Sequence, residues 1–245
     1  MGTKYSDSHV ENIERFRNII QQCSAFGVVY NPSNPKLSLA NMTLLLNEAE
    51  QLNTVYTKAF IAAKRPINER QELIEELVKR MRRVKNLVFC SGASESMMRD
   101  VEAMVDKFSG DKVRKKKTKD GKPAEKWVSN SHLGVDSRQE TLGLLLEVLR
   151  NEPHYTPNEP ILQMAALDDA AERLESLTRA VSGANANAAI KRIERDNALY
   201  LEGDGLVDVS LMCKKYVRAL FGARSEEAKV VSAIKLKRFI RIAQV

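Results

Sequence analysis

The sequence predicts an all-α protein, a tandem duplication of a four-helix bundle unit with coiled-coil-like heptad packing and a basic linker between the units. Three observations predict it. Apolar residues recur three and four positions apart, as they do on packed helices. No segment alternates apolar and polar residues as a strand does, and a pattern from the first half of the chain returns in the second. With only 11 Gly and 7 Pro among 245 residues, long stretches hold no helix breaker.

The repeat is clearest at a proline-rich turn. Tyr30-Asn-Pro-Ser-Asn-Pro-Lys-Leu-Ser-Leu-Ala40 returns 125 residues later as Tyr155-Thr-Pro-Asn-Glu-Pro-Ile-Leu-Gln-Met-Ala165, with five of eleven positions identical. Matches continue in order over about a hundred residues, and beyond residue 203 the offset becomes 132. Ordered similarity over such a length indicates an internal duplication.

The first unit, residues 1–109, is expected to hold helices over 8–26, 35–64, 66–89 and 94–108. Pro35 and Pro66 suit a first helical turn, where no amide donor is needed, and Asn34 and Ser94 are suitable N-caps. The apolar positions of its second helix are spaced as a and d residues of heptads: Met42, Leu45, Ala49, Leu52, Tyr56, Ala59 and Ala63.

The second unit, residues 132–245, is expected to hold helices over 137–150, 160–182, 186–221 and 225–243. Pro160 and Ser225 mark helix starts. The pair Gly203 and Gly205 predicts a break within the third of these helices, because two glycines cost about 2 kcal/mol in a helix interior. In both units the Tyr-x-Pro-x-x-Pro turn is interpreted as structural, with the tyrosine packed on its own bundle and its hydroxyl near water or a backbone group.

Between the units, residues 110–131 are expected to form a basic flexible linker. The formal net charge of the chain is +7, and residues 111–126 alone carry +5. Like charges repel and few apolar residues interrupt them. Replacing residues 112–126 by a Gly/Ser linker is expected to leave folding intact and to flatten the salt dependence of duplex-DNA binding by roughly 4 to 5 units.

The repeated turn, the stretch from Gly205 to Ala223 and the opening Met1-Gly-Thr-Lys resemble an uncharacterised group of small bacterial all-α proteins with an internal duplication. The resemblance covers nearly the whole chain. It implies no activity, ligand or catalytic residue.

No catalytic, cofactor or metal site is predicted. The histidines His9, His132 and His154 match no zinc pattern, and a surface or capping role is expected for His9 and His132. Phosphate-loop, nucleophile-elbow and di-iron signatures are missing. A non-enzymatic protein without cofactors is therefore expected. Three cysteines without CxxC spacing favour reduced thiols in the cytoplasm, and the sequence has neither a secretory signal nor an apolar run that could span a membrane.

Two function classes stay open. The first is a structural or interaction protein, a homo-oligomer or the partner of another protein, that self-associates through polarised charged helical faces. The alternative is nonspecific polyanion or nucleic-acid binding by the linker and a basic C-terminal helix; membrane-surface contact ranks below both. The candidate polyanion-binding residues are Arg114, Lys115, Lys116, Lys117, Lys119, Lys122, Lys126, Lys235, Lys237, Arg238 and Arg241.

Overall fold

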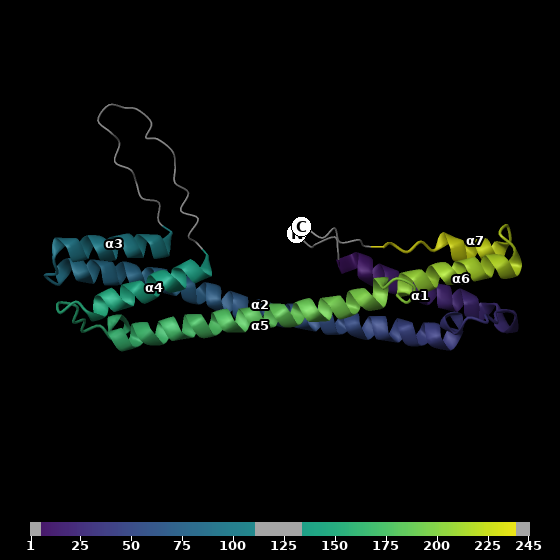
Figure 1. Ribbon diagram of the computed structural model, residues 1–245, viewed down its shortest axis with the longest axis horizontal. Helices are drawn as coiled ribbons and strands as arrows, with labels where there is room; N and C mark the ends of the chain where they lie inside the picture. The colour runs from purple at the N-terminus through teal and green to yellow at the C-terminus, as the bar shows by residue number, and fades with distance from the viewer. Residues whose placement is uncertain (1–5, 111–133, 239–245) are drawn as a thin grey trace, which may run out of the picture. The chain divides into compact units, whose positions relative to one another are not determined.

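The computed structural model describes residues 6–110 and 134–238 (Figure 1). These residues form helices and no strand, which confirms the all-α prediction. In chain order the α-helices of the described residues are α1 Ser6–Ala25, α2 Leu39–Cys90, α3 Glu95–Ser109, α4 Val135–Arg150, α5 Met164–Tyr200, α6 Leu206–Phe221 and α7 Glu226–Ala233. Short 3₁₀ turns cover Gly27–Val29, Pro35–Leu37 and Pro160–Leu162.

The chain packs into two compact units that do not coincide with the two repeats predicted from the sequence. Unit 1 combines Met1–Ala63 with Ala184–Val245, and unit 2 is Lys64–Gly183. Each unit thus takes part of both repeats. The expected limits at 1–109, 110–131 and 132–245 describe the duplication in the sequence, and as such they stay a prediction. Of the predicted linker 110–131, residues 111–131 lie outside the described residues.

The reason for this division is that α2 continues through Pro66, where the sequence predicted a new helix. A proline inside a helix costs about 3 kcal/mol because it removes one backbone hydrogen bond and crowds the preceding turn. The apolar face nevertheless keeps its register. Buried Ala63 and buried Ile74 are eleven residues apart, or about three helical turns, so one helix puts both on the same face. The 52 residues of α2 begin in unit 1 and end in unit 2, and α1 and α3 belong to different units.

The helix α5 likewise runs through Gly183, where the sequence predicted a gap between helices. Its buried Val181 and Ala188 are seven residues apart, close to two turns, so continuity again preserves the face. The predicted break at Gly203 and Gly205 is confirmed, because α5 ends at Tyr200 and α6 begins at Leu206. Gly203 has φ of 76°, a conformation that side-chain-bearing residues rarely adopt.

The proline-rich turns have the same internal hydrogen bond. The Tyr30 hydroxyl donates to the Leu37 carbonyl at 2.8 Å, and the Tyr155 hydroxyl donates to the Leu162 carbonyl at 2.7 Å. Both tyrosines are buried, so the expected backbone contact of the hydroxyl is confirmed. Pro35 and Pro160 begin 3₁₀ turns rather than the α-helices predicted from the sequence, and α2 and α5 start four residues later.

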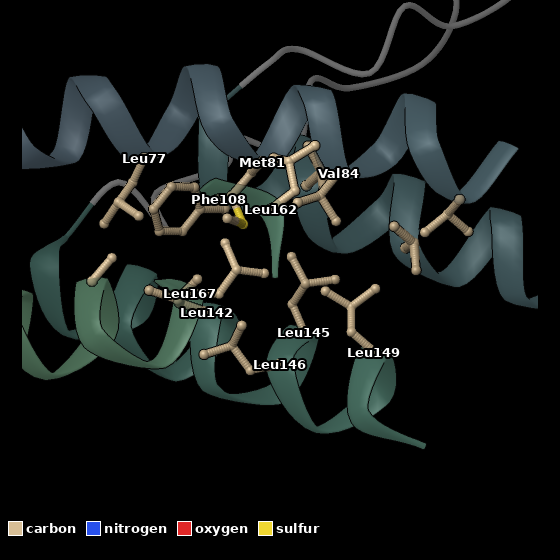
Figure 2. Close-up of a cluster of buried hydrophobic side chains, with 14 of the residues drawn as sticks. Leu77, Met81, Val84, Phe108, Leu142, Leu145, Leu146, Leu149, Leu162 and Leu167 are labelled. Atoms are coloured by element: carbon tan, nitrogen blue, oxygen red, sulfur yellow. The ribbon is translucent and has the colours of Figure 1, made fainter. Parts of the chain in front are cut away.

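Unit 2 has a hydrophobic core lined by four helices, shown in Figure 2. Met81 and Val84 come from α2, Phe108 from α3, and four leucines from α4. Leu162 and Leu167 close the core from the turn before α5 and from α5 itself. The α4 leucines are Leu142, Leu145, Leu146 and Leu149, at the 3–4 spacing typical of a packed helix face.

Unit 1 has its own core. Phe16, Ile19 and Cys23 of α1 pack with Met42 of α2, and Leu199 contributes from the end of α5. Ile13 of α1 and Leu46 and Ala49 of α2 also contribute, and the C-terminal part of the chain adds Leu206, Val209, Cys213 and Val217 of α6 and Val231 of α7.

The last predicted helix is corrected by the structure. The sequence predicted a helix over 225–243, but α7 ends at Ala233, and Ile234 already has the extended conformation φ −74°, ψ 100°. Residues 234–238 continue without helix, and residues 239–245 lie outside the described part of the chain. The cause is tertiary: side chains of α1 and α6 hydrogen-bond the backbone of residues 234, 235 and 237, as described next, and so replace hydrogen bonds of a helix.

Candidate interaction site

The C-terminal segment 234–238 lies extended on unit 1. Ile234 and Leu236 are half-buried against the core of unit 1, while Lys235 and Lys237 are exposed. This alternation is the two-residue period of an extended chain, in which successive side chains point to opposite sides. The segment therefore contributes apolar contact with every second residue and keeps its cations in water.

Asn12 of α1 holds the backbone of this segment. Its carboxamide nitrogen donates to the Lys237 carbonyl at 2.7 Å, and its carboxamide oxygen accepts from the Lys237 N–H at 2.9 Å. One fully buried side chain thus satisfies both backbone groups of one residue, as a neighbouring strand does in a sheet. Because only backbone atoms of Lys237 take part, this contact does not depend on the lysine side chain.

A polar network fixes the position of Asn12. Its carboxamide nitrogen lies 3.2 Å from the Tyr200 hydroxyl, which in turn lies 2.7 Å from Nδ1 of His9. The hydroxyl accepts from Asn12 and shares a second hydrogen bond with His9, in which the donor is set by the tautomer of the imidazole. Burial raises the pKa of Tyr200 to about 12. The expected surface or capping role of His9 is wrong, because the residue is buried.

Two cationic side chains bind further carbonyls of the segment. Arg15 of α1 donates to the Lys235 carbonyl, and Lys214 of α6 donates to the Ile234 carbonyl. Burial lowers the pKa of Lys214, and the nearby Arg218 charge acts in the same direction. Three side-chain donors of α1 and α6 therefore hold the backbone of the segment: the Asn12 amide, the Arg15 guanidinium and the Lys214 ammonium.

The cations at the end of the segment face carboxylates of the same chain. Arg238 forms an ion pair with Asp208 of α6. This hydrogen bond, together with one from the Gly203 N–H at 2.9 Å, holds the pKa of Asp208 below its usual range. The Lys237 ammonium lies 3.9 Å from a carboxylate oxygen of Glu11. Lys237 and Arg238 are among the predicted polyanion-binding residues, and these two contacts neutralise part of their charge.

The structure does not show where the other predicted polyanion-binding residues lie relative to this segment. Arg114, Lys115, Lys116, Lys117, Lys119, Lys122, Lys126 and Arg241 lie outside the described residues. Polyanion binding therefore stays a prediction. Sequence reasoning missed Asn12, Arg15, Tyr200 and Lys214, which no motif marks. A usable signal was the alternation Ile234-Lys-Leu-Lys237, which is typical of an extended segment rather than of a helix.

Among residues 6–110 and 134–238, no three His, Cys, Asp or Glu side chains gather closely enough to hold a metal ion. In the same residues, no helix combines the length and the apolar character that crossing a membrane requires. No family model matches the chain, and comparisons with curated proteins and with solved structures find no significant match. The resemblance to a group of bacterial proteins accordingly stays a prediction.

Proposed function

We propose that this protein is a non-enzymatic interaction protein that self-associates by exchanging its C-terminal segment between copies. The observation that carries the proposal is the two-way contact of Asn12 with the backbone of Lys237. The side chains that form hydrogen bonds or ion pairs with residues 234–238 belong to α1 and α6, and the same side chains would meet the same segment of a second chain. Exchange of an identical element is a low-cost route to a dimer.

The geometry of the segment supports exchange. It follows the eight-residue helix α7, and α7 is joined to α6 only by the short turn 222–225. An extended peptide that adds to a preformed edge gains affinity from main-chain hydrogen bonds and specificity from alternate side chains. Here Ile234 and Leu236 supply the alternate apolar contacts. This route replaces the polarised charged faces expected from the sequence, because Arg238 and Lys237 face carboxylates of their own chain.

We also propose that the chain arose by tandem duplication of a four-helix unit. The equal hydrogen bonds of Tyr30 and Tyr155, 125 residues apart, support this history. Equivalent caps support it too: Ser94 accepts from the Met97 N–H and Ser225 from the Ala228 N–H.

The exchange is tested with the full-length chain. Equal amounts of protein grown in ¹⁴N and ¹⁵N are mixed at high concentration, incubated, and treated with a zero-length carbodiimide cross-linker. The Lys237 ammonium and the Glu11 carboxylate are close enough for this coupling. Exchange yields Glu11–Lys237 cross-linked peptides that contain one light and one heavy half. Cross-links with matched isotopes only would contradict the proposal.

Cross-linking yields of two variants complete the test. Asn12→Asp keeps the shape but replaces the donor with a charged acceptor facing the Lys237 carbonyl. Because the same contact holds the segment in the closed monomer and in the exchanged dimer, we expect the variant to weaken docking of the segment about tenfold in both and to lower the yield of Glu11–Lys237 cross-links, since hydrogen bonds of this kind contribute about 1–2 kcal/mol. Asn41→Asp is the matched control, because Asn41 also donates to a backbone carbonyl, that of Pro35 at 2.8 Å, away from the segment. Equal loss in both variants would argue against the site.

A further inference from the structure

A pair of buried cysteines joins the two helices that hold the C-terminal segment. The helices α1 and α6 lie side by side in unit 1 (Figure 1). Cys23 of α1 and Cys213 of α6 meet there, with 3.3 Å between their Sγ atoms. Both side chains are fully buried free thiols. Sulfur atoms in van der Waals contact need only a small rotation of their side chains to reach bonding distance.

The cysteines share their helices with the side chains that hold the segment. On α1, Asn12 and Cys23 are eleven residues apart, or about three helical turns, so they lie on the same face. On α6, Cys213 directly precedes Lys214, whose ammonium donates to the Ile234 carbonyl. A bond between the two sulfurs therefore fixes the position of the α1 donors relative to the α6 donor.

The docked segment is itself a bridge between α1 and α6. Asn12 and Arg15 bind it from α1, and Lys214 binds it from α6. When the segment leaves, the two helices gain conformational freedom, and a disulfide between them withholds part of that gain. The disulfide thus raises the free energy of the open state relative to the docked state. Two bridges across the same pair of helices therefore favour each other.

We propose that Cys23 and Cys213 form a redox switch for the C-terminal segment: the disulfide tightens docking of the segment and slows its exchange between copies, and reduction reverses both effects. The effect on docking rests on the contacts seen in unit 1. The effect on exchange rests, in addition, on the proposed function.

The oxidant is a small hydroperoxide, which can reach the thiols during local openings of the core. The hydrogen bond from Cys23 lowers the pKa of the Cys213 thiol, although burial acts against it, so Cys213 reacts first. Its sulfur attacks hydrogen peroxide and becomes a sulfenic acid with release of one water. The Cys23 sulfur then attacks the sulfenic sulfur, the S–S bond forms and a second water leaves. Two thiols and one peroxide give one disulfide and two waters, and a small dithiol reverses the change by becoming a disulfide itself.

The test uses the full-length chain with Cys90→Ser, because Cys90 is exposed and reacts before the buried pair. One sample is treated with hydrogen peroxide until peptide mapping shows the Cys23–Cys213 linkage, and the other is kept in dithiothreitol. Hydrogen exchange of the Lys237 amide then measures opening of the segment, since this N–H donates to the Asn12 side chain. We expect exchange of this amide to be at least about fivefold slower in the oxidised sample, and dithiothreitol should restore it.

Cys23→Ala in the same background is the matched control. It cannot form the disulfide, but it carries the other groups that peroxide oxidises, methionines included. Its Lys237 exchange should be the same with and without peroxide. Cys23→Ser serves the same purpose if the alanine variant does not fold. Equal or faster Lys237 exchange after formation of the disulfide, or an equal response of the control, would overturn the proposal.

Isotope mixing separates the switch from the exchange itself. Mixed-isotope Glu11–Lys237 cross-links should appear at least about fivefold more slowly in oxidised than in reduced protein, because the segment must open before it can exchange. If the Lys237 amide responds to oxidation but no mixed cross-links form in either state, the effect on docking holds and the proposed exchange fails. If mixed cross-links form equally fast in both states and the amide does not respond, the exchange holds and the switch fails.

Discussion

The Sγ atom of Cys23 lies 3.3 Å from the Sγ atom of Cys213, and the contact joins α1 to α6 inside the core of unit 1. The Tyr30 hydroxyl lies 3.4 Å from the Cys213 sulfur and completes a small polar cluster. The hydrogen bond to Cys213 and burial both raise the pKa of the Cys23 thiol. All three cysteines are free thiols, and Cys90 is exposed.

Mild oxidation should join Cys23 to Cys213. Two thiols each lose a hydrogen to a reagent such as diamide, which is reduced to the hydrazine, and the protein mass falls by about 2 Da while one disulfide forms. The experiment uses a Cys90→Ser background so that the exposed thiol does not react. The cross-link should raise the melting temperature, because it closes a very long loop in the unfolded chain. Mass spectrometry showing both thiols unchanged after prolonged treatment would contradict this expectation.

The hydroxyl groups of the two turn tyrosines should each contribute to stability through a hydrogen bond to the backbone. Tyr30→Phe and Tyr155→Phe remove the bonds to the Leu37 and Leu162 carbonyls, and each should cost about 1 kcal/mol in the free energy of unfolding. Replacement by Ala should cost roughly 3–5 kcal/mol, because it also removes the buried ring.

Urea titrations followed by circular dichroism measure these differences. Tyr56→Phe serves as the control, because it keeps the ring that stacks on Phe60 and lies under the Arg195 guanidinium. It should change stability by a few tenths of a kcal/mol only. A Tyr30→Phe variant as stable as wild type would show that the hydrogen bond of the hydroxyl contributes nothing to the free energy of unfolding.

Alkaline pH should destabilise the protein through its buried tyrosines. Burial raises the pKa of Tyr155 to about 12 from an ordinary value of 10.0, and Glu159 adds to the shift. A raised pKa in the folded state means that the unfolded state releases its proton first as pH rises. The stabilising contribution is therefore complete below pH 10 and is lost between pH 10 and about 12. Tyr200 behaves in the same way.

Absorbance at the phenolate band, recorded together with circular dichroism, checks this expectation. Part of the tyrosine signal should titrate only near pH 12 or together with loss of helix. Tyr155→Phe should reduce that late fraction. Complete titration of all tyrosines around pH 10 with the helices intact would contradict the burial that the structure assigns.

Two glycines should respond in opposite directions to replacement by alanine. A Cβ at Gly205 would lie 2.5 Å from the Leu201 nitrogen and 2.8 Å from the Leu201 carbonyl oxygen, both backbone atoms. Gly205→Ala should therefore destabilise unit 1 by roughly 2–3 kcal/mol. A Cβ at Gly183, inside α5, meets nothing within 4 Å, and Gly183→Ala should stabilise by roughly 0.5–1 kcal/mol. Thermal melts distinguish the two signs directly.

Local sequence information determined the secondary structure of most of this chain. The 3–4 spacing of apolar residues predicted helices, and it also identified residues that are now found in the core of unit 1, such as Met42 and Ala49. The glycines at 203 and 205 predicted the break before α6, and the repeated tyrosine turns predicted the bonds of Tyr30 and Tyr155. These features depend on neighbours within a few residues, and short-range sterics and hydrogen bonding suffice to decide them.

Tertiary structure alone decided which helices pack together and where the interaction site lies. The sequence predicted that helices end near Pro66 and Gly183, but the buried faces on either side stay in register, so α2 and α5 continue. Each unit therefore contains parts of both predicted repeats. Likewise, the sequence around Lys237 predicted a basic helix. In the structure this segment is extended, because Asn12, 225 residues away, hydrogen-bonds the backbone of Lys237. Such contacts join residues that are far apart in the chain, and their free energy comes from burial and hydrogen bonds that no local pattern contains.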